Sequence, residues 1–172
     1  MALYKVIDNY LPEQVHKNLY NYCVFSEEPM WQFMPCQTSL KEMGKEPCQF
    51  IIPIQNDVIG LRLKHESVRS LFRKIDAYVF LRTKLNCTLK TETHKESTYH
   101  TDFEGALLCM TAIYYVNTNN GYTQFEHDGS KIDSVANRIV MFPSSLRHRA
   151  ITTTDTPYRM VMNINYHPKP LS

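Results

Sequence analysis

The second half of the chain is divided into short segments rich in β-branched and aromatic residues, and this division restricts the fold more than any other feature. Turn-forming sequences such as NTNNG and HDGS separate the segments. Short strands spaced by turns are typical of β-sandwiches and jelly rolls. The segments are LNCTLKTET, ALLCMTAIYYVN, GYTQFEH, NRIVMFP and PYRMVMNINYH. We therefore expect residues 85–172 to form a mostly β core.

The first half of the chain shows helical periodicity instead. Apolar residues recur at helical spacing between Leu11 and Cys23, and Pro12 stands where the first turn of a helix tolerates proline. A second apolar stripe predicts a helix over residues 67–82. This stripe consists of Val68, Leu71, Phe72, Ile75 and Val79. Helices that precede a run of strands favour a β-core covered by an N-terminal helical layer.

The segment of residues 26–50 contains three prolines and a glycine and has no apolar period. Long ordered loops of this kind are often functional, so we expect this one to cap the core. Residues 1–84 are then helical support and capping loop, and residues 85–172 are the core. A chain of 172 residues is about the size of one domain, so we expect a single domain over residues 1–172.

Charge and cysteine content exclude several classes of protein. The 19 basic and 17 acidic side chains give a net charge of +2, which argues against a dedicated nucleic-acid binder but leaves room for a local basic strip. The five cysteines are an odd number and none are at CxxC spacing, which argues against a disulfide framework or a zinc ribbon. The sequence shows no long apolar run and no leader, so we expect a cytoplasmic protein without a membrane segment.

The last segment, PYRMVMNINYH, places polar residues on one face of a strand. Strand alternation puts Arg159, Val161, Asn163 and Asn165 on one side and apolar residues on the other. An arginine that points into a small β-barrel requires an anionic partner, because an unpaired buried charge is costly. The simpler alternative is that this face is the solvent side of an edge strand, and the segment alone does not decide between the two.

Three other polar residues favour the first interpretation. His100 and Asp102 are two apart in YHTDF, so at a strand end their side chains point the same way, and His148 follows the strand NRIVMF. Two imidazoles and one carboxylate on one side of a metal form the facial triad of non-haem Fe(II) oxygenases. Arg159, eleven residues after His148, then supplies a bidentate partner for a carboxylate. Two other histidines offer alternative ligands, but they adjoin charges and turn formers and are expected to be exposed: His94 and His127.

With these residues in place, the sequence resembles the 2-oxoglutarate- and Fe(II)-dependent dioxygenase superfamily, especially its prolyl-4-hydroxylase-like branch. The resemblance covers most of the chain. VIDNYLPEQ is similar to the opening strand and helix start of the family, YHTDF to its metal-binding HxD, and NGYTQFE to its GGxTxF hairpin strand. FPSSLRH, followed by YRMVMNINY, is similar to the closing strands. The resemblance implies a double-stranded β-helix, or jelly roll, with flanking helices.

The resemblance also implies an activity. His100, Asp102 and His148 would bind Fe(II), and Arg159 would bind the distal carboxylate of 2-oxoglutarate. The co-substrates would be 2-oxoglutarate and O2, with ascorbate as an optional reductant. The prime substrate would be a protein side chain of the prolyl type or a small molecule, and its identity and the oligomeric state stay open.

One position departs from the pattern of this family. Many relatives carry a hydroxyl residue two positions after the arginine, and Val161 stands there in this chain. The missing hydrogen bond is expected from a tyrosine or from Thr111, and Asn163, on the Arg159 face, is expected to contact the co-substrate or the prime substrate. Two alternatives keep the same residues: a zinc-dependent hydrolase and a non-catalytic jelly-roll binding module. The first leaves the arginine unexplained and lacks an evident glutamate base.

Overall fold

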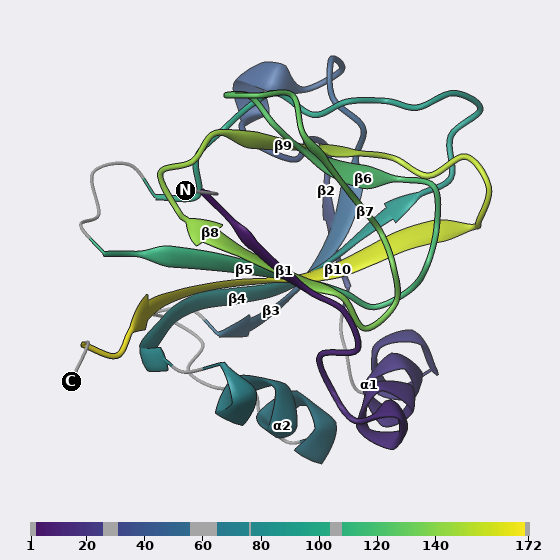
Figure 1. Cartoon of the computed structure of the whole chain (residues 1–172). Helices are drawn as coiled ribbons and strands as arrows, with labels where there is room; N and C mark the ends of the chain where they lie inside the picture. Colours follow the sequence, from purple (N-terminus) through teal and green to yellow (C-terminus); the bar gives the residue numbers. More distant parts are fainter. Residues whose placement is uncertain (1–2, 26–30, 56–64, 76, 104–107, 171–172) are drawn as a thin grey trace.

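A computed structural model of the chain describes residues 3–25, 31–55, 65–75, 77–103 and 108–170. Two antiparallel sheets face each other, and the two α-helices lie outside the larger one (Figure 1). The larger sheet has the strand order β1-β8-β5-β10-β4-β3-β2, and the smaller has the order β7-β6-β9. This is the predicted double-stranded β-helix with a helical layer, so the predicted fold class is confirmed.

The elements follow one another along the chain with these bounds. The helices are α1 (Glu13–Phe25), the short 3-10 helix η1 (Leu40–Glu42) and α2 (Glu66–Lys74). The strands are β1 (Lys5–Ile7), β2 (Gln32–Met34), β3 (Gln49–Gln55), β4 (Ala77–Leu89), β5 (Met110–Tyr115), β6 (Tyr122–Phe125), β7 (Lys131–Asp133), β8 (Ile139–Pro143), β9 (His148–Ile151) and β10 (Tyr158–Pro168).

Strand β10 lies in the middle of the larger sheet and separates two apolar cores. On one face, Met162 and Ile164 pack with residues of α1 and α2 such as Leu19 and Leu71. On the other face, Val161 packs with residues of both sheets, in the space between them. The alternation predicted for the last segment is therefore confirmed, and the polar residues of β10 point between the sheets.

The second helix is shorter than its apolar stripe predicts. Helix α2 ends at Lys74, and the chain continues from Ala77 as the thirteen-residue strand β4. The prediction of a helix over residues 67–82 is therefore wrong beyond Lys74. The physical reason is tertiary pairing, because β4 lies between β10 and β3 and hydrogen-bonds to both. Val79, expected on the buried stripe, is 41% exposed.

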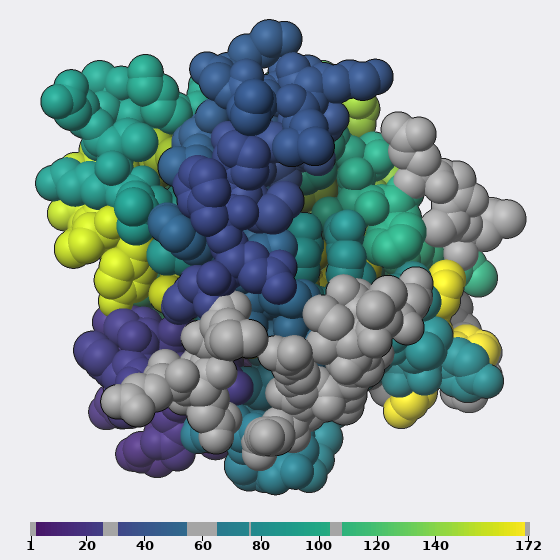
Figure 2. Space-filling view, turned by 180° about the vertical axis from the view of Figure 1, so that it is seen from behind, coloured from purple at the N-terminus to yellow at the C-terminus, as the bar shows by residue number. Residues whose placement is uncertain are grey.

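The sheet also begins earlier in the chain than the expected division at residue 85. Strands β1, β2 and β3 and the first part of β4 all precede that position, and β3 belongs to the larger sheet. Of the segment 26–50, expected as an irregular cap, residues 26–30 lie outside the described residues. Residues 31–50 contain β2, η1 and the start of β3 and spread over one face of the molecule (Figure 2). Of the parts that the structure describes, no helix is both long and apolar enough to cross a membrane.

Candidate active site

His100 and His148 are held together by their own backbones. His148 begins β9, and the N–H of each histidine donates to the carbonyl of the other at 3.0 Å. Their ring centroids are 4.7 Å apart. Asp102 is fixed beside them, because its N–H donates to the carbonyl of Ser144 at 3.1 Å. Backbone pairing therefore brings the three predicted metal ligands together from segments more than forty residues apart.

The two imidazoles present the same nitrogen to the site. Nδ1 of His100 lies 3.0 Å from the carbonyl oxygen of Thr98, and Nδ1 of His148 lies 3.0 Å from that of Leu146. A carbonyl oxygen can only accept, so each Nδ1 carries a proton, and in the neutral form of each ring the free lone pair is on Nε2. Histidine ligands of metals are oriented by such second hydrogen bonds. Both rings are therefore set up to bind a metal through Nε2.

The third ligand completes a site that fits one metal ion. The possible ligand atoms of His100, Asp102 and His148 all lie within 4.8 Å of one another. His148 Nε2 is 3.9 Å from Asp102 Oδ2, and both side chains are 4% exposed. Burial lowers the pKa of His148, although Asp102 opposes this shift, so the imidazole stays neutral and able to donate a lone pair. Two neutral imidazoles and one carboxylate suit Fe(II) with open positions.

The carboxylate of Asp102 is oriented by donors from three strands. Arg82 Nη2 donates to Oδ1 at 3.0 Å, while Thr111 Oγ1 and Asn165 Nδ2 donate to Oδ2 at 2.8 and 3.1 Å. Asn163 Nδ2 lies 3.4 Å from both oxygens. Burial opposes the charge, but His148, Arg82 and His100 together hold the pKa of Asp102 below its usual value. Asp102 therefore presents a fixed anionic carboxylate to the site.

Thr111 and Asn163 lie at this end of the site. Thr111, or alternatively a tyrosine, was expected to supply the hydrogen bond that Val161 cannot make, beside Arg159. The structure places its hydroxyl against Asp102 and Ser144 instead, because β5 pairs Thr111 with Asn165 and not with Arg159. Asn163 lines the pocket, and its Oδ1 has no hydrogen-bond partner among the described residues.

Arg159 lies at the other end of the same pocket. Its side chain is 3% exposed, and its Nε and Nη2 donate to Ser134 Oγ at 3.0 Å and Thr123 Oγ1 at 3.1 Å. The guanidinium also lies over the ring of Tyr115. No carboxylate of the described residues pairs with it, and burial lowers the pKa of Arg159. A buried cation held only by neutral groups is suited to bind an anionic ligand.

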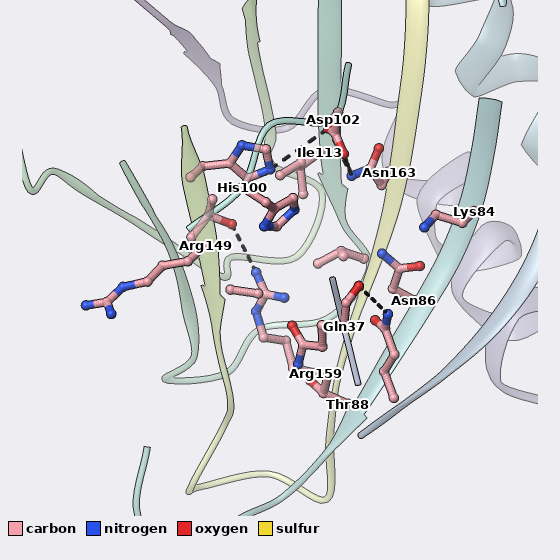
Figure 3. A pocket seen from close by; sticks show the side chains of 15 residues that line it. Gln37, Lys84, Asn86, Thr88, His100, Asp102, Ile113, Arg149, Arg159 and Asn163 are labelled. Carbon is pink, nitrogen blue, oxygen red and sulfur yellow. Dashed lines mark hydrogen bonds and ion pairs between the residues drawn. The ribbon is translucent and has the colours of Figure 1, made fainter. Parts of the chain in front are cut away.

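Between these ends, the walls of the pocket are polar. Strand β4 contributes Lys84, Asn86 and Thr88, and the capping segment contributes Gln37 and Gln49 (Figure 3). Four lining atoms are buried and lack a hydrogen-bond partner within the described residues: Gln37 Nε2, Asn86 Oδ1, Thr88 Oγ1 and Asn163 Oδ1. Buried polar atoms are almost always hydrogen-bonded in native proteins. Their concentration here indicates a pocket built for a polar ligand.

Glu46, in the capping segment, hydrogen-bonds to the residues just before His100. Its carboxylate accepts from the N–H groups of Gln37 and Thr38 at 2.9 Å each and from the Thr98 N–H at 2.5 Å. Burial opposes its charge, but these donors, Thr98 first among them, hold the pKa of Glu46 below its usual value. Thr98 in turn accepts from His100, so Glu46 supports the ligand indirectly.

We expect Glu46→Gln to lower the free energy of unfolding by roughly 1–3 kcal/mol at neutral pH, because an amide loses the charge that strengthens these bonds. The pKa of Glu46 is lower in the folded than in the unfolded state. Its stabilisation is therefore complete above the unfolded value of about 4.3 and disappears as pH falls below it. Urea unfolding of both proteins across this range is the measurement. A stability difference that did not shrink in acid would contradict the role of Glu46.

Several site residues were not found from the sequence. Arg82 was assigned to the predicted helix and Lys84 fell just before the strand expected from residue 85, whereas strand alternation back from Thr88 would have placed both on the pocket face. Thr123 and Ser134 belong to the facing sheet and its loops, and no local pattern links them to Arg159. His94 bonds through Nδ1 to the carbonyl of Thr152 and is not part of the ligand cluster.

Comparisons with known proteins support the fold. No protein-family model and no curated protein matches the sequence. Among solved structures, a prolyl hydroxylase of Trichoplax adhaerens, in complex with a hypoxia-inducible-factor peptide, aligns over 96% of this chain and 83% of its own, with a TM-score of 0.65 and 14% identity. A viral collagen prolyl hydroxylase of Paramecium bursaria Chlorella virus 1, in complex with 2-oxoglutarate, aligns over 98% and 97%, with a TM-score of 0.62 and 14% identity. An α-ketoglutarate-dependent epimerase of nogalamycin biosynthesis aligns over 96% and 78%, with a TM-score of 0.66 and 12% identity.

Proposed function

We propose that this chain is an Fe(II)- and 2-oxoglutarate-dependent dioxygenase that hydroxylates an organic substrate. One observation carries the proposal: a single pocket holds both a His-Asp-His ligand cluster and a buried arginine that has no acidic partner among the described residues. The cluster suits Fe(II), and the arginine suits the distal carboxylate of 2-oxoglutarate. Structures of such oxygenases share this fold, which supports the proposal, while the residues of the pocket carry the argument for the chemistry.

The bound metal would supply the redox chemistry, in which O2 oxidises 2-oxoglutarate to succinate and CO2 and one oxygen atom becomes a hydroxyl group on the substrate. The protein supplies binding, orientation and exclusion of water. His100 and His148 donate their Nε2 lone pairs, and Asp102 donates a carboxylate that Arg82 and Thr111 orient. Arg159 fixes the far end of the co-substrate, which determines how its keto-acid end meets the metal.

The two alternatives have less support. A zinc hydrolase needs a general base beside the metal, and no glutamate lines the described part of the pocket. It also leaves Arg159 without a function. In this site, both imidazoles hydrogen-bond to carbonyls through Nδ1, which directs both Nε2 atoms to the same point. A non-catalytic binding module has no need of such an arrangement.

For the prime substrate, we propose a protein side chain, such as a prolyl group, or a small molecule. The similar structures include enzymes of both kinds by their descriptions, a prolyl hydroxylase with a bound peptide and an epimerase of antibiotic biosynthesis. We further propose that the enzyme works in a reducing compartment such as the cytoplasm, since all five cysteines are free thiols.

The proposal is tested by 2-oxoglutarate turnover. Purified protein supplied with Fe(II), ascorbate and O2 should convert 2-oxoglutarate to equal amounts of succinate and CO2, slowly without a prime substrate and faster with one. Zn(II) in place of Fe(II) should abolish turnover, because zinc has no redox chemistry. A protein that bound Zn(II) selectively and produced no succinate with Fe(II) would contradict the proposal.

A further inference from the structure

Lys84 is a cation inside the pocket for which the proposed reaction has no use. It lies on the inward face of β4, where its Cα is paired with Asn163 of β10 on one side and with Pro53 of β3 on the other. Figure 3 shows its side chain projecting from β4 toward the interior of the pocket, on the same side as Asn86. Among the described residues, its ammonium group has no hydrogen-bond or ion-pair partner.

Burial is costly for this ammonium group. Desolvation lowers the pKa of Lys84 to about 8; Arg82 adds to the shift, and Asp102 only partly opposes it. Lysine usually keeps its charged end in water and buries only its stem. A lysine whose charged end is instead enclosed by the walls of a ligand pocket is expected to have an anionic partner when the pocket is filled.

The proposed co-substrate does not provide that partner. One carboxylate of 2-oxoglutarate neutralises Arg159, and the other, together with Asp102, neutralises the two charges of Fe(II). Two positive charges, those of Arg82 and Lys84, are then left over, because the charge of Asp102 is already counted against the metal. Arg82 still contacts Asp102 and its side chain is 31% exposed, so water can stabilise its charge, whereas Lys84 has no such contact. With the co-substrate bound, the single charge of Lys84 is the one that still needs a partner, and a monoanion such as a carboxylate matches it better than a dianionic phosphate.

Two further atoms beside Lys84 await a ligand. Asn163 donates through Nδ2 toward Asp102, so its Oδ1 is the acceptor left without a partner. Asn86 lies two residues further along the same face of β4 and also has an unpartnered Oδ1. An ammonium donor flanked by two amide acceptors can bind a carboxylate whose neighbouring atom carries an N–H or O–H group.

We propose that Lys84, with Asn163 and Asn86, forms a subsite for a carboxylate of the prime substrate. The substrate class is thus an acid that carries an N–H or O–H group next to its carboxylate, either as a free molecule or as the acidic end of a peptide. This inference rests on the proposed function for the identity of the pocket, and it adds a determinant of substrate choice that the metal ligands and Arg159 do not supply.

The experiment uses Lys84→Met, which keeps the length of the side chain and removes its charge. Lys90→Met, just beyond β4 and exposed, is the matched control. Each protein is loaded with Mn(II) and 2-oxoglutarate without O2, and ¹³C-labelled acetate is added as the probe. Mn(II) accelerates the relaxation of ¹³C nuclei that bind nearby, so a titration gives the affinity of the pocket for a carboxylate without any turnover. Acetamide, of the same shape but neutral, is the second probe.

Lys84→Met should bind acetate at least about tenfold more weakly than wild type does, which is the usual effect of losing one charge-assisted hydrogen bond. Lys90→Met should behave as wild type, and acetamide should not bind. The melting temperature of Lys84→Met should not fall, because replacing a buried unpaired charge by an apolar side chain is favourable. A lower melting temperature with unchanged acetate affinity would mean a structural role and would overturn the proposal.

The same samples show whether Lys84 binds a carboxylate of the prime substrate or one of 2-oxoglutarate. Affinity for 2-oxoglutarate should be unchanged in Lys84→Met, because Arg159 and the metal bind the co-substrate. If it fell while acetate binding to the loaded protein did not, Lys84 would belong to the co-substrate site and the proposal would be wrong. If wild type bound neither Mn(II) nor 2-oxoglutarate, the proposed function would fail. Acetate bound by the unloaded wild type and lost in Lys84→Met would still establish the subsite.

Discussion

Replacing Asp102 by asparagine should abolish 2-oxoglutarate turnover. The amide keeps the shape of the side chain and an oxygen that can accept from Thr111, but it loses the charge that a divalent metal requires. Mutations of outer partners of metal ligands already cost about 10–100-fold in metal affinity, so loss of the anionic ligand itself should cost at least about a hundredfold. The measurement is Fe(II) binding by anaerobic titration, together with succinate formation.

Asparagine is a better choice here than alanine. Arg82, Thr111 and Asn165 all donate to Asp102, and alanine would leave these donors without a partner in a buried site, which would confuse loss of metal with loss of structure. Asp128→Asn, in an exposed turn, is the matched control and should retain full activity. Parent rates of succinate formation in Asp102→Asn would show that the assigned ligand is wrong.

Replacing Arg159 by methionine should remove co-substrate binding but leave metal binding intact. Its guanidinium is held by neutral hydroxyls and faces the pocket, so a carboxylate there would gain a bidentate, charge-assisted pair. Its loss should raise the KM for 2-oxoglutarate by about a hundredfold, or about 2.7 kcal/mol. Steady-state kinetics with varied 2-oxoglutarate are the measurement. Fe(II) affinity should not change, because Arg159 is bonded to none of the three ligands.

A keto acid that lacks the distal carboxylate tests the same contact from the side of the ligand. Wild type should strongly prefer 2-oxoglutarate to 2-oxobutyrate, and Arg159→Met should lose this preference because neither compound then has a partner for its tail. Arg147→Met, an exposed arginine paired with Glu126, should keep the preference of wild type. An unchanged preference in Arg159→Met would place the carboxylate elsewhere in the pocket.

The strands and the metal cluster could be predicted because their signals are local. Alternation along residues 158–166 correctly separated the apolar face from the face that carries Arg159 and Asn163. The spacing of His100 and Asp102 predicted two neighbouring members of the cluster, and the strand that ends before His148 predicted the third. These features depend on the geometry of a single strand or turn, which the sequence determines directly.

Strand β4 could not be predicted in the same way. Its first residues continue the helical spacing of α2 as far as Val79, and periodicity alone does not distinguish a short strand from a helix in such a stretch. Pairing with β10 and β3 decides the outcome, and those partners lie far away in the sequence. Since Arg82 and Lys84 lie on β4, this one error concealed two residues of the site.

The hydroxyls that hold Arg159 were missed for a related reason. Thr123 lies on β6 and Ser134 just after β7, so they reach Arg159 only because the smaller sheet folds over the larger one. The sequence suggested a tyrosine or Thr111 as the substitute for the hydroxyl missing at Val161, but the strand register places Thr111 against Asp102 instead. Contacts between sheets depend on the tertiary arrangement, which no local pattern contains.

A crystal structure of the protein with Mn(II) and 2-oxoglutarate, grown without O2, tests the central claim most directly. The account predicts one ion bound by Nε2 of His100, the carboxylate of Asp102 and Nε2 of His148, with 2-oxoglutarate on the same ion and its distal carboxylate on Arg159. An ion bound elsewhere, or a co-substrate whose distal carboxylate did not meet Arg159, would contradict it.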